Sequence, residues 1–261
     1  MMTAECNTLP ANKDQLTIAK ALCSDNAVKV SHPGQPLVTV ITVVFNCAEH
    51  IDKTIQSVIS NSYNNLEYII IDGGSTDGTV DIINKYGINI DFFSSEKDDG
   101  IYHAMNKGLD MATGDYVIFL GADDTLVTIP EYDLTSAGLL LCDVDCGTWV
   151  FRHPDLGILQ KRMRYRNSIH PQGTFYKRSR IRFNTEYRLC ADYLFNLEYM
   201  SEGMNICYSD CTASRFSVFG ASSKWEAKLE IIRIAYMRHG LLSLFKSLIY
   251  HVYSHVRSCT Q

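Results

Sequence analysis

Long apolar runs alternate with helical patterns over residues 37–125. The run from Leu37 to Phe45 is almost wholly β-branched or aromatic, which is typical of a strand buried on both faces of a parallel sheet. Shorter apolar runs predict three more strands, at residues 68–71, 90–93 and 116–120. Apolar residues at helical spacing predict the intervening helices, which begin near Ile51, Val80 and Ile101. The alternation predicts right-handed crossovers and a mostly parallel α/β sheet with helices on both faces.

Polar or flexible groups follow the carboxyl end of each predicted strand. These groups are Asn46, the segment Asp72–Ser75, residues 96–100 and the segment Gly121–Asp124. In an open parallel sheet, ligands bind beyond the carboxyl ends of the strands. The sequence therefore predicts that the four segments converge on one crevice.

Two adjacent carboxylates, Asp123 and Asp124, follow the fourth predicted strand. Like charges at such a position repel each other unless solvent or a cation intervenes, and magnesium and manganese prefer oxygen ligands. An acidic turn without a ligand is the alternative. Asp72 can accept a hydrogen bond from a base or a ribose, and the small residues after it allow close approach. Together these groups predict a site for a nucleoside diphosphate and a divalent metal.

Several function classes are excluded by what the sequence lacks. The first strand is followed by Asn-Cys-Ala-Glu-His at residues 46–50, not by the G-x-G-x-x-G of dinucleotide-binding oxidoreductases. No G-x-x-x-x-G-K-[ST] phosphate loop is present either. A formal net charge of −5 argues against a general nucleic-acid binder. Nine scattered cysteines and no hydrophobic signal peptide at the amino end indicate reduced thiols in a cytoplasmic setting.

Five segments in order then carry a resemblance to a known family. They read V-T-V-I-T-V-V-F-N to Asn46, I-I-I-D-G-G-S-T-D-G-T to Thr79, D-G-I-Y-H-A-M-N-K-G to Gly108, A-T-G-D-Y to Tyr116 and F-L-G-A-D-D to Asp124. This order resembles the nucleotide-binding half of family 2 glycosyltransferases with the A-type fold. The third segment resembles the bacterial branch that builds exopolysaccharide and lipopolysaccharide O-chains. The resemblance implies an N-terminal extension (1–36), a catalytic domain (37–223, divided near residue 125) and a C-terminal tail (224–261).

The resemblance also implies roles for individual residues. Val43 and Phe45 would line the base and ribose, and Asp72 would accept a hydrogen bond from the base. Asp123 would lie near the ribose and sugar, and Asp124 would ligate Mn²⁺ or Mg²⁺. The nucleotide and donor sugar would be bordered by Asp99, Gly100, Asn106 and Lys107. One departure concerns Gly121, where the family often has Asp or Asn, and it puts the number of carboxylate ligands in question.

The second half is expected to supply the acceptor site and the base. Asp192 precedes an apolar helix, so it is either a helix N-cap or, as the family order implies, the general base. His170 and Gln172 resemble a family segment under the acceptor pocket, and a buried histidine with one hydrogen bond is the alternative. The basic run Lys161–Arg166 suits either a solvated strand or loop face or a phosphate-bearing acceptor such as a lipid diphosphate.

The end of the chain reads differently from the rest. The segment Ser217–Ser223 resembles the family's Gly-Gly-x-Ser turn, with Ala221 in place of the second glycine. No acidic residue follows Glu230, whereas basic and apolar residues continue to Gln261. A basic amphipathic helix of this kind suits an anionic membrane surface. A helix packed on the catalytic domain or on a partner subunit is the alternative.

These expectations combine into one function. The sequence predicts an inverting, metal-dependent hexosyltransferase that moves a sugar from a UDP-sugar or similar donor to a lipid-linked saccharide. It would act at the inner face of the cytoplasmic membrane in cell-surface polysaccharide biosynthesis. A sugar nucleotidylyltransferase would carry a glycine-rich basic phosphate loop after the first strand, which this chain lacks. A degenerate nucleotide-sugar-binding scaffold subunit without catalysis is the non-enzymatic alternative.

Overall fold

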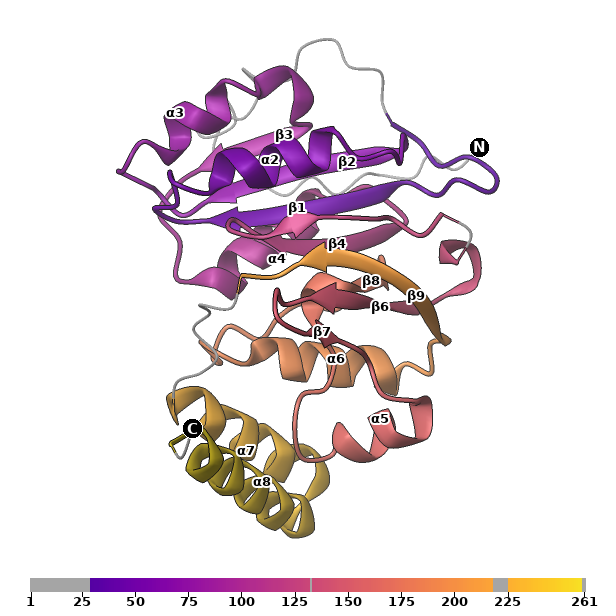
Figure 1. Cartoon of the computed structure of the whole chain (residues 1–261), viewed down its shortest axis with the longest axis vertical. Coiled ribbons are helices and arrows are strands. Elements are labelled where there is room, and N and C mark those ends of the chain that lie inside the picture. The colour runs from indigo at the N-terminus through magenta and orange to yellow at the C-terminus, as the bar shows by residue number, and fades with distance from the viewer. Residues whose placement is uncertain (1–28, 132, 218–224, 260–261) are drawn as a thin grey trace, which may run out of the picture.

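A single mixed sheet runs through the computed structural model, which describes residues 29–131, 133–217 and 225–259 (Figure 1). Its strands in this part of the chain are β1 (Val38–Val44), β2 (Leu66–Asp72), β3 (Phe92–Ser95), β4 (Tyr116–Gly121), β5 (Thr125–Leu126), β6 (Leu139–Asp145), β7 (Val150–Phe151), β8 (Thr174–Lys177) and β9 (Ile206–Arg215). Their order is β3-β2-β1-β4-β8-β6-β9-β5, and β7 pairs with β6. Residues 1–28 of the expected N-terminal extension and residues 218–223 of the expected turn lie outside the described residues.

The first half of the sheet is parallel, as the sequence predicted. β1 lies between β2 and β4 and pairs in parallel with both, and β3 pairs in parallel with β2. The connecting helices are α2 (Ile51–Ile59), α3 (Thr79–Asn84) and α4 (Ile101–Met111). The carboxyl ends of these strands therefore meet at one edge, and the mixed α/β architecture is confirmed.

β1 is buried on both faces, which explains why its sequence consists of β-branched residues throughout. Ile41 and Val43 belong to one hydrophobic cluster, with side chains of α4. Val38, Val40 and Val44 belong to the other cluster, with side chains of α2 and α3. Alternate side chains of a strand point to opposite faces, so each cluster covers one face of the sheet.

A helical glycine brings α4 against the sheet. A Cβ atom at Gly108 would lie 2.5 Å from Cγ2 of Ile41 on β1. Only a residue without a side chain allows this approach. Gly108 therefore fixes how closely α4 packs beside the carboxyl edge of β1.

The second half of the sheet continues the first without a break. β8 pairs antiparallel with β4 and with β6, and β6 pairs in parallel with β9. The helices of this half are α5 (Leu156–Arg162), α6 (Ala191–Ser201) and the short 3₁₀ turn η3 (Pro171–Gly173). The basic run Lys161–Arg166 begins in the last turn of α5 and continues as the loop that follows the helix, in which Met163 is buried in the core. The expected loop is therefore correct for residues 163–166, and no part of the run is a strand.

Two helices, not one, follow the catalytic part. They are α7 (Trp225–His239) and α8 (Leu241–Cys259), and Gly240, with φ +78°, separates them. Figure 1 shows this pair at the end of the molecule opposite α2 and α3. Among the described residues, no helix is long and apolar enough to cross a membrane.

Candidate active site

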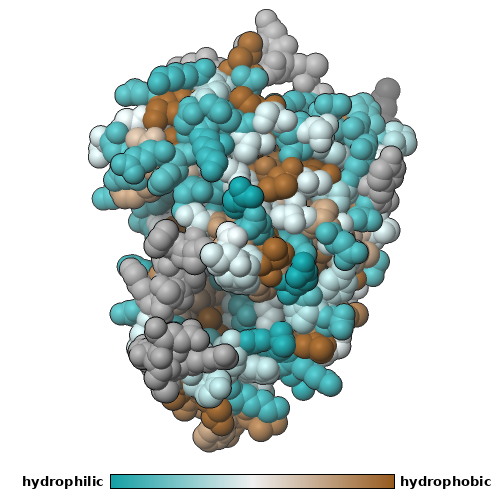
Figure 2. All heavy atoms as spheres, in the orientation of Figure 1, coloured by the Kyte–Doolittle hydropathy of each residue, from teal (hydrophilic) through white to brown (hydrophobic). Residues whose placement is uncertain are grey.

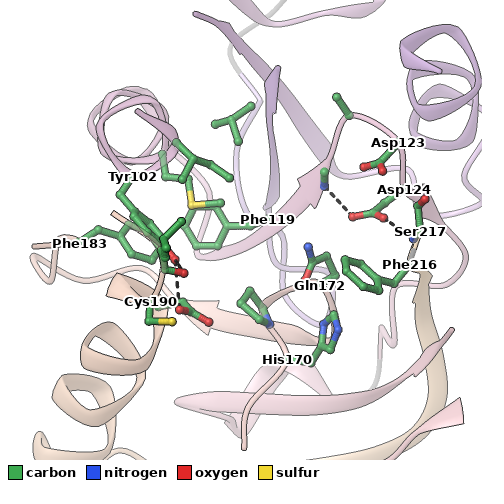
Figure 3. A pocket seen from close by; sticks show the side chains of 18 of the residues that line it. Tyr102, Phe119, Asp123, Asp124, His170, Gln172, Phe183, Cys190, Phe216 and Ser217 are labelled. Carbon is green, nitrogen blue, oxygen red and sulfur yellow. Dashed lines mark hydrogen bonds between the residues drawn. The ribbon is translucent and has the colours of Figure 1, made fainter. Parts of the chain in front are cut away.

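A pocket of about 610 Å³ opens at the carboxyl ends of β1 and β4 and extends to η3 and the start of α6. Seven of the residues singled out from the sequence line it, namely Val43, Phe45, Asp123, Asp124, His170, Gln172 and Asp192. Figure 3 shows Asp123 and Asp124 on one side of this pocket and Tyr102 and Cys190 on the other. The structure thus brings the acidic pair and the candidate base to one cavity.

Asp124 is the buried member of the acidic pair, and Asp123 is the exposed one. The carboxylate of Asp124 accepts hydrogen bonds from the backbone N–H groups of Gly121 (3.0 Å) and Ser217 (2.9 Å). Burial raises the pKa of Asp124 to about 6, and the Ser217 N–H counteracts this rise only in part. Asp124 therefore pays a desolvation cost for its charge that a nearby cation would offset.

The departure at Gly121 has a structural explanation. A Cβ atom at this position would lie 2.5 Å from Oδ2 of Asp124 and 3.2 Å from Oδ1 of Asp123. The Asp124 carboxylate thus occupies the space into which a side chain at residue 121 would project.

The acidic pair fits a metal that is bound together with substrate phosphates. No cluster of three or more potential ligands among Asp, Glu, His and Cys exists in the part of the chain that the structure describes. Mg²⁺ is commonly held by one or two carboxylates, with phosphate and water oxygens filling the remaining positions. Asp124 and Asp123 supply that number of carboxylates at the edge of a pocket, so the residues present fit such an ion.

Asp192 lies in the first turn of α6, whereas Cys190 is the N-cap. Asp192 is therefore the second residue of the helix. It is not the N-cap, which was one of the two alternatives that the sequence left open. Its carboxylate accepts hydrogen bonds from Oη of Tyr102 (3.2 Å) and Nδ2 of Asn167 (2.7 Å). Burial raises the pKa of Asp192 to about 6, against the opposing effect of the Tyr102 hydrogen bond. A carboxylate poised near neutral pH in a pocket is suited to proton abstraction.

Hydrogen bonds to the buried side chain of Asn196 and to the backbone hold Asn167 in place, and no sequence pattern predicted them. Oδ1 of Asn167 accepts hydrogen bonds from the backbone N–H of Ile169 (3.2 Å) and from Nδ2 of Asn196 (3.3 Å). Oδ1 of Asn196 in turn accepts from Oη of Tyr176 (2.8 Å). These bonds fix which end of the Asn167 amide points at Asp192, so Nδ2 is the atom that faces the carboxylate.

Glu230 on α7 supports the same region from outside the pocket. Its carboxylate accepts hydrogen bonds from the backbone N–H groups of Arg188 (3.0 Å), Leu189 (2.9 Å) and Cys190 (2.8 Å). These N–H groups lie directly before α6, where the helix leaves its first N–H groups without intrahelical partners. Nothing local in the sequence signals this contact, because it joins residues about forty positions apart.

His170 and Gln172 lie below the acidic pair. The ring of His170 packs at 4.9 Å from that of Phe216, and burial lowers the pKa of His170 to about 4. The ring is therefore neutral at pH 7, and its Nδ1 has no hydrogen-bond partner among the described residues. The side chain of Gln172 interacts with both His170 and Asp124. Gln172 thus links the predicted acceptor segment to the acidic pair.

The remaining five predicted residues do not line this pocket. The carboxylate of Asp72 is fully buried. It accepts hydrogen bonds from the N–H groups of Gly74 and Ser75 in the loop after β2, and from Oγ of Ser95 at the end of β3. It therefore shapes the loop after β2. Asp99 and Gly100 are exposed just before α4.

Asn106 and Lys107, on α4, make contacts inside the protein. The side chain of Asn106 binds both the N–H and the C=O of Phe183, whose ring lines the pocket. Nζ of Lys107 lies 2.8 Å from a carboxylate oxygen of Glu96. Asn106 therefore positions a pocket wall, and Lys107 is ion-paired at the rim of the crevice.

The parallel half-sheet, the acidic pair at its carboxyl edge and the half-buried carboxylate in the first turn of α6 are those of an A-type glycosyltransferase fold. Two solved structures share it. TarS from S. aureus (residues 1–349, with UDP-GlcNAc) has a TM-score of 0.63 and 18% identity, with coverage of 81% of this chain and 71% of that chain. The mannosyltransferase PcManGT from Pyrobaculum calidifontis (with GDP-Man and Mn²⁺) has a TM-score of 0.56 and 19% identity, with coverage of 89% and 78%.

Sequence comparison relates part of the chain to one family. Residues 39–128 match the model of glycosyl transferase family 2. A PGL/p-HBAD biosynthesis glycosyltransferase of Mycobacterium bovis (strain BCG / Pasteur 1173P2) is 29% identical over 214 residues, which cover 76% of this chain and 83% of that protein. The match relates residues 39–128 to the family 2 glycosyltransferases, the family that the motifs of this segment resemble.

Proposed function

We propose that the protein transfers a hexosyl group, with inversion, from a nucleoside diphosphate sugar to a hydroxyl of a lipid-linked saccharide. The observation that carries this proposal is the single pocket lined by Asp123 and Asp124 on one element and by Asp192 on another. A metal-binding pair and a base are the two groups that a direct displacement at a sugar carbon requires.

The donor side of the proposal rests on the acidic pair. A divalent metal, Mn²⁺ or Mg²⁺, would be held by Asp124 with Asp123 beside it, and it would neutralise charge on the leaving diphosphate. Val43 and Phe45, at the end of β1, would lie along the base and ribose. We take UDP as the nucleotide, and the TarS complex with UDP-GlcNAc, which has the same fold, supports this choice.

The acceptor side rests on Asp192. Its carboxylate would take the proton of the acceptor hydroxyl as that oxygen attacks the anomeric carbon from the face opposite the diphosphate. A single displacement of this kind inverts the anomeric configuration. Tyr102 and Asn167 would hold the carboxylate in one orientation, because each donates a hydrogen bond to a different oxygen of Asp192.

The acceptor is proposed to be lipid-linked and to lie at the inner face of the cytoplasmic membrane. His170, Gln172 and Arg188, from the second half of the chain, also line the pocket and would contact the acceptor. Arg188 would suit a phosphate-bearing acceptor, since a guanidinium pairs well with phosphate oxygens. The motif resemblance to enzymes of bacterial polysaccharide synthesis supports the same choice.

The test measures donor binding in the wild type and in variants of the metal-binding pair and of the candidate base. Thermal unfolding of the purified protein is followed with UDP, GDP and other nucleoside diphosphates, each with and without Mn²⁺, and in parallel for Asp124→Asn and Asp192→Asn. Ligand binding to the folded state raises the unfolding temperature. We expect UDP with Mn²⁺ to stabilise the wild type and Asp192→Asn, but not Asp124→Asn. Stabilisation by no nucleotide under any condition would favour the scaffold alternative.

A further inference from the structure

The helix α8 turns its polar side toward the protein. Ser243, Ser247 and His251 recur at a spacing of four residues and are 6%, 0% and 6% exposed. Residues four apart lie on one face of a helix. This buried face therefore consists of small hydroxyls and an imidazole, not of aliphatic side chains.

The opposite side of α8 is apolar and open to solvent. Seven large apolar side chains are 43% to 68% exposed there, namely Leu241, Leu242, Phe245, Leu248, Ile249, Val252 and Tyr253. We call them the α8 apolar face. Figure 2 shows hydrophobic residues gathered over α7 and α8 at the lower edge of the molecule.

This arrangement is the reverse of that in a helix that covers a protein core, whose apolar stripe faces inward. It also leaves buried polar atoms unsatisfied, since Oγ of Ser247 and Nε2 of His251 have no hydrogen-bond partner within residues 29–131, 133–217 and 225–259. The main aromatic contact of α8 with the protein is that of Tyr250, which packs against Arg166 and Tyr165. The large apolar side chains on the outward face take no part in this packing and are available for another contact.

The charges around α8 indicate the chemistry of that contact. Lys246 is exposed and lies one helical turn from Leu242 and from Ile249, so it stands at the edge of the α8 apolar face. Arg233 on α7 and Arg164 are also exposed, whereas Arg238 is ion-paired with Glu198 (2.7 Å). No acidic residue follows Glu230 in the sequence. An apolar face bordered by cations matches the interface of an anionic bilayer, where apolar groups enter the acyl region and cations meet the head groups.

We propose that the α8 apolar face docks on an anionic lipid surface. A second copy of the chain fits the face less well, because two such faces packed symmetrically bring their Lys246 side chains together without carboxylates to pair them. Docking also brings the active site to the surface, since α7 contributes Ile231 to the pocket wall and Glu230 to the loop before Asp192. This last step rests on the proposed function, whereas lipid binding itself does not.

The experiment is co-sedimentation of the full chain with vesicles of phosphatidylcholine, with and without phosphatidylglycerol. The test variant is Phe245→Ser with Ile249→Ser. The matched control is Ile88→Ser with Met111→Ser, which changes two exposed apolar residues far from α8. We expect the test variant to lose at least about tenfold in affinity for anionic vesicles, while the control binds like the wild type. Lys246→Glu should weaken binding to anionic vesicles and leave binding to neutral ones unchanged.

The possible outcomes separate this inference from the proposed function. Thermal unfolding checks that the test variant is folded, which its exposed positions favour. Equal binding by wild type and test variant would overturn the inference. A wild-type dimer that the same variant dissociates, without vesicle binding, would assign the face to a second copy. Asp192→Asn should bind vesicles like the wild type; a wild type that binds vesicles but transfers no sugar would sink the proposed function alone.

Discussion

The carboxylate of Glu230 accepts a hydrogen bond of 2.8 Å from the backbone N–H of Cys190, the N-cap of the helix that carries Asp192. The same carboxylate binds the two preceding N–H groups. An α7 side chain thus organises the backbone from which α6 begins. Through this contact the C-terminal helices and the candidate base form one structural unit.

Replacement of Glu230 by alanine is expected to lower both stability and transfer. Three N–H groups lose a charged acceptor, at a cost of about 1–3 kcal/mol in the free energy of unfolding. The loop before α6 would then hold Asp192 less firmly, so kcat should fall more than donor binding does. Denaturant unfolding and steady-state kinetics measure the two effects. Glu226→Ala, an exposed position on the same helix, is the control and should change neither.

Asp192→Asn should abolish transfer and yet stabilise the protein at alkaline pH. Folding raises the pKa of this carboxyl from 3.8 to about 6. Burial of its charge therefore lowers the free energy of unfolding. This destabilisation is absent below pH 4 and grows as the pH rises to about 6. Two pKa units correspond to about 3 kcal/mol. Asparagine carries no charge at either pH. The free energy of unfolding of the variant should therefore exceed that of the wild type by nearly this amount at pH 8 and equal it at pH 4. Urea unfolding at both pH values tests this, and an equal effect at both would contradict it.

The pH profile of kcat/KM should fall on the acid side with a midpoint near 6. Protonation of Asp192 removes the base, so the rate decreases about tenfold for each pH unit below that value. Saturating metal keeps Asp124 ionised and leaves Asp192 as the group that titrates. In Asn167→Ala the carboxylate loses its 2.7 Å hydrogen bond, and the midpoint should move upward by about one unit. A rate lowered equally at all pH values would show that Asn167 has only a structural role.

Gly121→Ala should impair donor binding without unfolding the protein. The new Cβ atom would lie 2.5 Å from Oδ2 of Asp124, and the carboxylate, as the end of a side chain, can move away. Its hydrogen bond with the Gly121 N–H would then be lost. The stabilisation by UDP and Mn²⁺ in thermal unfolding should decrease by half or more. Gly157→Ala on α5 has open space around its Cβ position and serves as the control.

The sequence predicted the strands that are buried on both faces and the site residues that follow their carboxyl ends. β1 and β4 are recognisable because nearly all of their buried positions are β-branched or aromatic, and the acidic pair is recognisable because it follows the end of a strand. Tyr102, Asn167 and Glu230 were not predicted. Each acts on Asp192 or its loop from a distant position in the chain, and only tertiary packing brings them together.

The C-terminal helices show a different limit of sequence reasoning. The sequence pattern predicted an apolar stripe on the C-terminal helix. It did not indicate whether this stripe faces the protein or the solvent. Only the burial of Ser243, Ser247 and His251 shows that α8 turns its polar face inward. The break at Gly240 was also missed, since the apolar pattern continues through it.

The pairing of β4 with β8 joins the first half of the chain, proposed to bind the donor, and the second half, proposed to bind the acceptor, in one hydrogen-bonded sheet. The two halves therefore have no hinge between them, and they cannot close on a substrate as rigid bodies that rotate about a linker. The separation between the acidic pair and Asp192 is set when the chain folds, before any ligand arrives. Such an enzyme reaches its reactive geometry by preorganisation, and any rearrangement during turnover is confined to the segments that leave the sheet.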